Sequence, residues 1–339
     1  MILFWLGLAL MCLPFVTLTT FWGVIHERVS SVYLPRFSRI FTERPLFVVP
    51  RGKPLAEAEV VRFATSDGLT LRGCYLKASG PRRGVILFGL EFTSDCWSCR
   101  SYCENLVAHG FDVFAYEPRS HGQSDTMPGY EPMQWVTDHE VRDAQAALAY
   151  LKGRPDADPR GIGLFGISKG AGAGMLAAIP DSYVRCAVTD GMFATKTTLL
   201  PYMGQFFVIY KSFFPEVLIP QFYYRVIAFF ALRLVRRERH CGFPSLETAL
   251  ARLGPRPLLM IHGAQDQYIR PEMARKLFEL AGGSPENREF WLVEGAKHNQ
   301  ALNVANAEYH ERVLSFFERH LAGGVARPLA VERRVAMQC

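Results

Sequence analysis

The sequence lacks the fingerprints that nucleotide-binding and nucleic-acid-binding proteins carry. It contains no P-loop, and the glycines within residues 170–174 lie outside the pattern of a dinucleotide-binding fold. The net charge at pH 7 is only +6, and the basic residues are scattered along the chain instead of forming one dense patch. We therefore expect no nucleotide cofactor and no nucleic-acid partner.

The chain also lacks the regular cysteine framework of a disulfide-rich secreted protein, although it has eight cysteines. Cys96, Cys99 and Cys103 have the spacing C-x2-C-x3-C, which places them on one face of a helix. They supply only three ligands, and this helix is expected to pack on a sheet, so we interpret them as buried thiols. The alternative is a metal or cluster site. The sequence thus predicts a reducing compartment, with neither a metal ion nor an organic cofactor.

Charged side chains are absent from the first 25 residues. A segment of this length can span a bilayer, and Trp5 and Trp22 lie near its ends, where interfacial aromatic residues occur. The basic start and the clear cleavage site of a secretory signal are missing. We therefore predict an uncleaved transmembrane helix at residues 1–25, with a removed signal sequence as the alternative.

Residues 26–55 form a basic connector that contains prolines. Arginine and lysine outnumber glutamate in this stretch, and the positive-inside rule places such a segment on the cytoplasmic side of a membrane. The sequence therefore predicts a single-pass membrane protein whose catalytic domain is cytoplasmic.

Strand-like and helix-like patterns alternate along residues 56–323. After an opening hairpin at residues 60–76, this alternation predicts an α/β domain with a mostly parallel sheet. Between about residues 192 and 250 the alternation breaks, and an aromatic-rich stretch is followed by four arginines. We interpret this stretch as a helical cap that either contacts acyl chains and the bilayer or packs its aromatic residues on the core. Residues 324–339 are predicted to be a C-terminal tail.

The most informative motif is G-x-S-x-G at residues 166–170. It follows a short apolar run and precedes a helix start rich in small residues, so it combines a strand, a sharp turn and a helix. Such a turn lifts the serine hydroxyl clear of the sheet. The motif therefore predicts that Ser168 is a nucleophile.

A nucleophilic serine needs a base and an acid that orients this base. Asp266 follows the apolar strand at residues 257–263, and His298 follows the strand at residues 289–293. The order Ser, Asp, His and the positions after strand ends suit a catalytic triad. Asp190, which ends the strand pattern at residues 184–189, is the competing acid and is otherwise a loop cap.

Acyl transfer also needs donors for the oxyanion. The backbone N–H of Lys169, directly after the nucleophile, is one candidate, and the N–H of Leu90, after the strand that ends in Phe88-Gly89, is the other. Glu91 follows at once, and a carboxylate there would oppose the oxyanion. We expect Glu91 to point away, or else to bind a cationic part of the substrate.

These motifs resemble the α/β-hydrolase superfamily over residues 60–321. Residues 112–125 are similar to its D-x-R-G-x-G-x-S loop, with Glu117 and Ser120 in place of the usual Asp and Gly. The resemblance implies an eight-stranded, mostly parallel sheet flanked by helices. It is closest to lipase, esterase and thioesterase-like members and to the hydrolase domain of prolyl oligopeptidases. The sequence contains no propeller-like repeats, which argues against a propeller-gated peptidase.

We therefore predict a membrane-anchored serine hydrolase that cleaves carboxylic esters or thioesters through Ser168, His298 and Asp266. Its expected partners are a small-molecule or lipid acyl substrate and a membrane, and no oligomeric state is predicted. Alternatives are a serine peptidase or acyltransferase with the same triad, and a membrane-tethered binding protein without catalytic activity.

Overall fold

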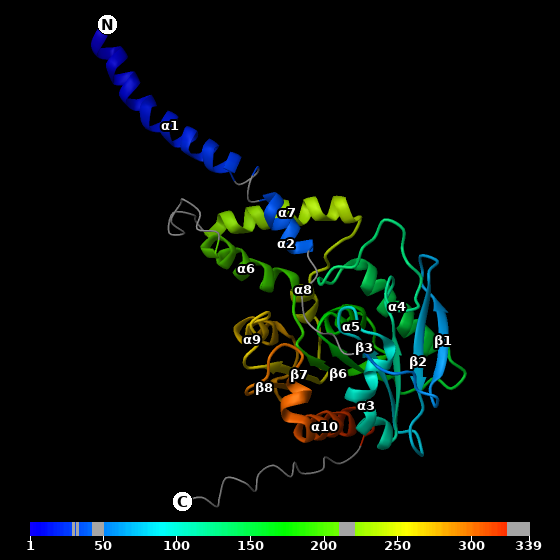
Figure 1. Cartoon of the computed structure of the whole chain (residues 1–339). Coiled ribbons are helices and arrows are strands. Elements are labelled where there is room, and N and C mark those ends of the chain that lie inside the picture. Colours follow the sequence, from blue (N-terminus) through cyan, green and yellow to red (C-terminus); the bar gives the residue numbers. More distant parts are fainter. Residues whose placement is uncertain (29–30, 32–33, 43–50, 210–220, 324–339) are drawn as a thin grey trace, which may run out of the picture.

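A single eight-stranded sheet forms the centre of the computed structural model, which describes residues 1–28, 31, 34–42, 51–209 and 221–323 (Figure 1). The strand order is β1-β2-β4-β3-β5-β6-β7-β8. Only the pairs β1–β2 and β2–β4 are antiparallel, so the predicted mostly parallel sheet of eight strands is confirmed. The strands are β1 (Glu59–Ala64), β2 (Thr70–Leu76), β3 (Gly84–Gly89), β4 (Phe111–Tyr116), β5 (Ile162–Ile167), β6 (Val184–Asp190), β7 (Leu258–Gly263) and β8 (Arg288–Val293).

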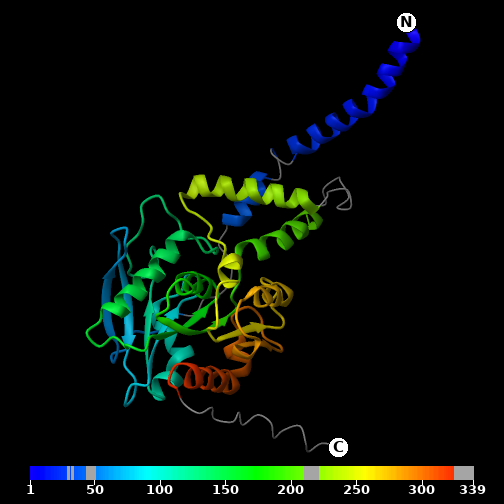
Figure 2. The ribbon, with the colours of Figure 1, turned by 180° about the vertical axis from the view of Figure 1, so that it is seen from behind.

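Helices cover both faces of this sheet (Figures 1 and 2). One apolar cluster joins the sheet to α4 (Asp138–Gly153), α5 (Lys169–Ala178) and α9 (Pro271–Leu280). A second cluster joins it to α3 (Cys99–Ala108) and α10 (Ala301–His320). Every residue of β3, β4, β5 and β7 is buried, which explains why these strands are apolar runs without alternation.

The cysteines of the C-x2-C-x3-C pattern lie in the second cluster. Cys96 is in a short 3-10 turn, Cys99 and Cys103 are in α3, and all three side chains are buried. The Sγ atom of Cys74 lies 3.9 Å from that of Cys99, and burial raises the pKa of Cys103 well above its usual value. Within the described residues, no group of histidine, cysteine and acidic side chains is arranged to hold a metal ion. The interpretation as buried thiols agrees with this environment.

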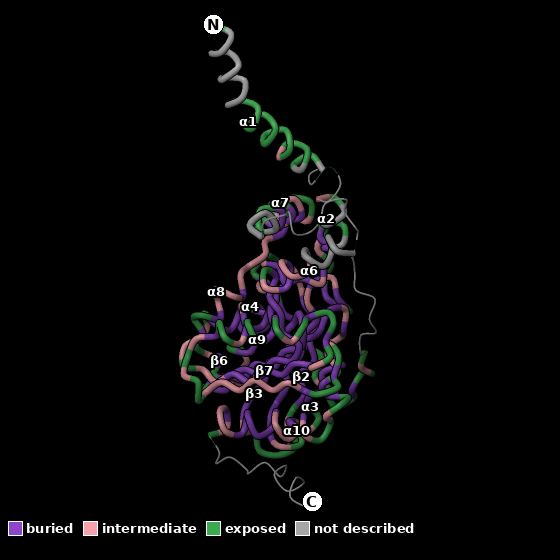
Figure 3. The backbone as a smooth tube through the Cα atoms, turned by 90° about the vertical axis from the view of Figure 1, so that its left-hand side faces the viewer, coloured by how far each residue is buried: buried purple, intermediate pink, exposed green. Residues whose placement is uncertain are grey.

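A further group of helices lies toward the end of the molecule opposite α10 (Figure 3). It consists of α2 (Leu34–Thr42), α6 (Thr195–Ile209), α7 (Gln221–Arg239) and the short α8 (Leu246–Leu250). The last three lie within the stretch predicted to be a cap. Many of its aromatic residues fall at positions 203–224, whose side chains lie outside the described residues, as do residues 43–50 of the connector and the predicted tail.

The N-terminal helix α1 (Ile2–Arg28) projects away from the molecule on the side of α2 and α7 (Figures 1 and 2). In the part of the chain that the structure describes, no helix combines the length and apolar character needed to cross a membrane. The transmembrane helix predicted at residues 1–25 is therefore not supported by the structure.

Candidate active site

Ser168 occupies the sharp turn between β5 and α5. Its φ of 51° and ψ of −117° define a backbone conformation that residues other than glycine rarely adopt. The glycines of the motif have steric reasons: a Cβ on Gly166 would overlap the backbone of Ala171, and one on Gly170 would overlap the carbonyl of Leu90. The motif thus forms because α5 packs closely against the ends of β5 and β3.

The three residues of the predicted triad lie in one hydrogen-bonded chain. Ser168 Oγ is 3.0 Å from His298 Nε2, and His298 Nδ1 is 2.6 Å from Asp266 Oδ2. They come from the loops after β5, β8 and β7, whose carboxyl ends meet at one edge of the parallel sheet. The arrangement lets the imidazole accept the serine proton while the aspartate holds the opposite ring nitrogen.

Backbone groups fix the orientation of Asp266. Its Oδ1 accepts hydrogen bonds from the N–H groups of Tyr268 and Ile269, each at 2.9 Å. His262 is fully buried, and its Nε2 is 2.7 Å from the Ile269 carbonyl oxygen and 3.4 Å from Asp266 Oδ2. Burial lowers the pKa of His262, so it stays neutral and its Nε2–H donates to the carbonyl.

The competing acid Asp190 has a different environment. It ends β6, is buried, and accepts a hydrogen bond of 3.0 Å from the Tyr309 hydroxyl, while its Oδ1 has no partner among the described residues. Burial raises its pKa to about 7. Asp266, and not Asp190, is therefore the acid that contacts His298.

Glu91 is a further buried carboxyl group, and it lies close enough to Asp190 to be affected by its charge. It is 2% exposed, and neither carboxyl oxygen has a hydrogen-bond partner within the described residues. Burial, with a smaller contribution from Asp190, raises its pKa to about 8, so the side chain is mainly neutral at pH 7. A neutral acid does not repel a nearby oxyanion, which removes the conflict expected from the sequence.

Two backbone contacts bring the predicted oxyanion donors together. Lys169 is the first residue of α5, where N–H groups lack partners within the helix. Gly89 and Gly170 approach so closely that a Cβ on either would overlap the other's backbone, which places Leu90 beside the start of α5. The residues of the two predicted donors are therefore neighbours in space, as the oxyanion-hole hypothesis requires.

The side chain of Lys169 points into a buried polar network that the sequence analysis did not identify. Its Nζ is 2.8 Å from Glu140 Oε1 and donates to the Met133 carbonyl at 2.6 Å. Glu140 also accepts hydrogen bonds from Thr137, whose backbone and side chain form a capping box at the start of α4, and from Tyr130. The lysine lowers the pKa of the buried Glu140 to about 2. The T-x-x-E pattern at residues 137–140 indicates the capping box, but it does not indicate that Glu140 pairs with Lys169.

The loop that resembles the D-x-R-G-x-G-x-S motif, within residues 112–125, is held by buried ion pairs and hydrogen bonds. Ser120, where the superfamily has glycine, has a φ of 59°, so this position keeps the left-handed conformation. Glu117 pairs with Arg72 at 3.3 Å and accepts a hydrogen bond from the backbone N–H of Gln123. Arg119 is fully buried and binds Asp143 at 2.7 Å. These contacts give the loop a structural role.

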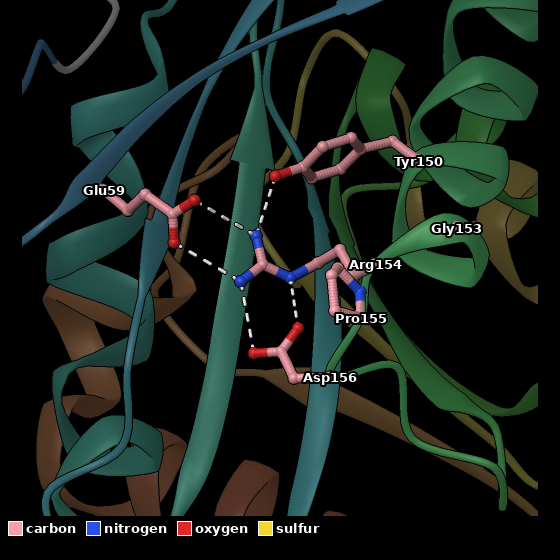
Figure 4. Close-up of a pocket in the computed structure, with 6 residues that line it drawn as sticks. All are labelled: Glu59, Tyr150, Gly153, Arg154, Pro155 and Asp156. Atoms are coloured by element: carbon pink, nitrogen blue, oxygen red, sulfur yellow. Dashed lines mark hydrogen bonds and ion pairs between the residues drawn. The ribbon is translucent and has the colours of Figure 1, made fainter.

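Two surface hollows differ in their relation to the triad. One of about 440 Å³ is lined by residues of the β7–α9 loop, including Asp266 and Arg270. The other, of about 580 Å³, lies between β1 and the end of α4 (Figure 4). There Arg154 is bound by Glu59, Asp156 and Tyr150, so its charge is already compensated within the protein. Only the first hollow contains a triad residue.

Comparisons with known proteins agree with this fold. A curated relative, the uncharacterized protein YfhR of Escherichia coli O157:H7, is 25% identical over 272 residues, which is 76% of this chain and 80% of that protein. The thiohydrolase aneE of Aspergillus aculeatus is 32% identical over 134 residues, covering 38% of this chain and 40% of that protein. The structure of the Pyrococcus furiosus esterase Pf2001 matches with a TM-score of 0.60 and 20% identity, covering 82% of this chain and all of that one.

The model of the alpha/beta hydrolase family matches residues 84–314, which include the serine turn, the aspartate loop and the histidine loop. This match covers more than half of the chain, and the strand order and the elbow at Ser168 agree with it. The chain belongs to the alpha/beta hydrolase family.

Proposed function

We propose that this protein is a serine hydrolase that cleaves carboxylic esters or thioesters. The observation that carries the proposal is the hydrogen-bonded chain from Ser168 Oγ through His298 to Asp266, built on a strained turn. An isolated serine hydroxyl is a weak nucleophile, and this arrangement is the one that activates it. A relative named as a thiohydrolase and a structural neighbour named as an esterase support the same bond classes.

In the proposed reaction, Ser168 Oγ attacks the acyl carbonyl while His298 Nε2 takes the hydroxyl proton. The N–H groups of Lys169 and Leu90 stabilise the oxyanion. The charged imidazole, held by Asp266, then donates the proton to the departing alcohol or thiol, which leaves an acyl-serine. Water attacks this ester with His298 as base, and the imidazolium then returns the proton to Ser168 Oγ as the bond to the acyl group breaks and the carboxylic acid leaves.

Labelling by a fluorophosphonate probe tests the nucleophile directly. We expect covalent labelling of the purified full chain and none of a folded Ser168→Ala variant, because the reagent requires an activated serine. Thr189→Ala, which removes a buried hydroxyl within β6, serves as the control and should still be labelled. A well-folded wild type that resists labelling would favour the alternative of a binding protein without catalytic activity.

We also propose that the acyl group is lipophilic. The support is the apolar cluster that joins the cap to the triad side of the domain, where Phe193 of the β6–α6 connection packs with Ile269 and Met273 of the β7–α9 region. Turnover of p-nitrophenyl esters graded by chain length tests this. Higher kcat/KM for long chains is expected, and equal or better turnover of acetate contradicts the proposal. Adding alcohol or amine acceptors would reveal acyltransfer as a new product.

We propose in addition that the N-terminal segment attaches the protein to a membrane with the hydrolase domain on the cytoplasmic side. The first 25 residues are uncharged, and α1 carries exposed apolar side chains such as Leu13 and Phe15. On cell fractionation, we expect the full chain in the membrane fraction and a variant that lacks residues 1–28 in the soluble fraction. A fully soluble full chain would contradict attachment, and protease protection of the domain in sealed inside-out vesicles would contradict its side.

A further inference from the structure

The outer face of α7 differs from the rest of the described surface. Val226, Phe229 and Phe230 are 40%, 60% and 50% exposed. The rings of Phe229 and Phe230 pack edge to face, with 5.5 Å between their centroids. Other large apolar side chains exposed on the described hydrolase domain come from different elements, such as Leu280 of α9 and Val304 of α10. Three neighbouring exposed apolar side chains on one helix form a patch, and such patches are typical of interaction sites.

The same helix buries its opposite face. Ile227, Ala228, Ala231 and Val235 follow helical spacing and pack in the cluster that includes Phe41 of α2. This packing fixes the rotation of α7, so Phe229 and Phe230 cannot turn inward without breaking the cluster. Their exposure is therefore a consequence of the fold.

Arginines add positive charge to the exposed side of α7. Arg225, Arg233, Arg236 and Arg237 are exposed, and within the described residues none of them has an ion-pair partner. Many other arginines of the domain are paired, for example Arg142 with Asp67 and Asp138. A helix with phenylalanine and unpaired arginine on its solvent face has the composition of an interfacial helix that binds anionic lipid.

We propose that the outer face of α7, defined by Val226, Phe229, Phe230, Arg233 and Arg237, docks on an anionic phospholipid surface. The phenylalanines enter the headgroup boundary, and the arginines bind lipid phosphates. The helix lies at the end of the molecule from which α1 projects and opposite α10, so one surface can meet both α1 and α7 (Figures 1 and 2). Docking does not depend on the proposed hydrolysis.

The experiment must separate docking of α7 from attachment by α1, so every variant keeps the full chain. In a Cys12→Ser, Cys339→Ser background, Phe229→Cys carries an environment-sensitive fluorophore, and Leu280→Cys on α9 is the matched control because Leu280 is 40% exposed. The probes are phosphatidylcholine vesicles with or without phosphatidylserine, both containing a nitroxide lipid. We expect at least about two-fold stronger quenching at position 229 than at 280 with the anionic vesicles.

Charge-reversal variants, measured with the same fluorophore at position 229, test the role of the arginines. Arg233→Glu with Arg237→Glu should reduce the quenching at position 229 roughly ten-fold or more at limiting lipid, whereas Arg252→Glu, at another exposed arginine, should not. Equal quenching at positions 229 and 280, or equal quenching with neutral vesicles, would overturn the proposal. A fluorescence change that grows with protein concentration in the absence of lipid would overturn it in favour of a second copy of the chain.

Discussion

Two carboxyl groups close to His298 illustrate how surroundings decide the role of a residue. Asp266 accepts two backbone N–H groups as well as the imidazole. Asp190 has one unpartnered oxygen in a buried position, and burial raises its pKa to about 7. Of the two, only Asp266 is arranged to stabilise a positively charged imidazole in the proposed reaction.

Substitution of each aspartate tests this assignment. We expect Asp266→Asn to lower kcat/KM by roughly 10³–10⁴-fold, because the amide no longer holds the required histidine tautomer or its charged form. Asp190→Asn should cost far less, since Asp190 contacts Tyr309 and not the imidazole. Steady-state kinetics with one activated ester measures both. An equal loss in the two variants would contradict the assignment.

Glu91 leads to a pH prediction at the same scale. Its pKa of about 8 lies above the value of 4.5 expected for an unfolded chain, so folding takes up a proton between these values. The stability that Glu91 contributes is full below pH 4.5 and is lost as pH rises toward 8. We expect Glu91→Gln to gain stability over wild type with rising pH, by up to about 1.4 kcal/mol per pH unit.

Urea unfolding at pH 5, 6.5 and 8 measures this difference. Glu279→Gln on the exposed surface of α9 is the control, and its difference from wild type should stay nearly constant. A pH-independent difference for Glu91→Gln would show that Glu91 is ionised in the folded protein or reaches a partner.

At the scale of elements, the Lys169–Glu140 pair ties the start of α5 to the start of α4. Both side chains are buried, so the loss of one partner leaves the other charge unpaired in the interior. The pair also holds the loop between β4 and α4 through the Met133 carbonyl. The residue directly after Ser168 is thereby held by buried contacts of its side chain.

We expect Lys169→Met to lower the free energy of unfolding by about 3 kcal/mol or more, and the double variant with Glu140→Gln to recover a large part of this loss. Lys152→Met, in an exposed pair with Asp181 at 2.6 Å, should cost less than about 1 kcal/mol. Urea denaturation gives all of these values. Additive effects of the two buried substitutions would contradict direct coupling.

At the scale of the whole molecule, the helix α2, which follows α1 in the chain, packs into the fold. Phe41 of α2 stacks on Trp135 at 4.6 Å between ring centroids, and the Trp135 indole donates to the Phe41 carbonyl at 2.8 Å. The helices α2 and α7 share the same apolar cluster. The segment after α1 therefore stabilises the layer that covers the triad side of the sheet.

Removal of one side chain tests this stabilisation. Phe41→Ala should destabilise the protein by about 3–5 kcal/mol because Phe41 is 3% exposed, and a clear fall in Tm is expected. Phe15→Ala on α1 removes the same atoms from a side chain that is 70% exposed, so its Tm should match wild type. Thermal unfolding followed by circular dichroism compares them, and equal Tm values would contradict the packing of α2.

The sequence by itself determined the α/β class, the serine turn and the order Ser168, Asp266, His298. These features depend on local patterns: apolar runs, glycines two positions from the serine, and polar residues directly after strand ends. Parallel strands bring their carboxyl ends to one edge, so a local position in the sequence already predicts proximity in space. For the triad residues, the contacts agree with that prediction.

Only the tertiary structure decided the partner of Lys169, the burial of Glu91 and the contact of Phe41 with Trp135. Lys169 and Glu140 are both common surface residue types, and no local pattern pairs them across two helices. Glu91 is neutral because neighbouring segments exclude water, and Phe41 meets Trp135 across 94 residues of chain. Such contacts arise from how distant segments pack, which local patterns do not encode.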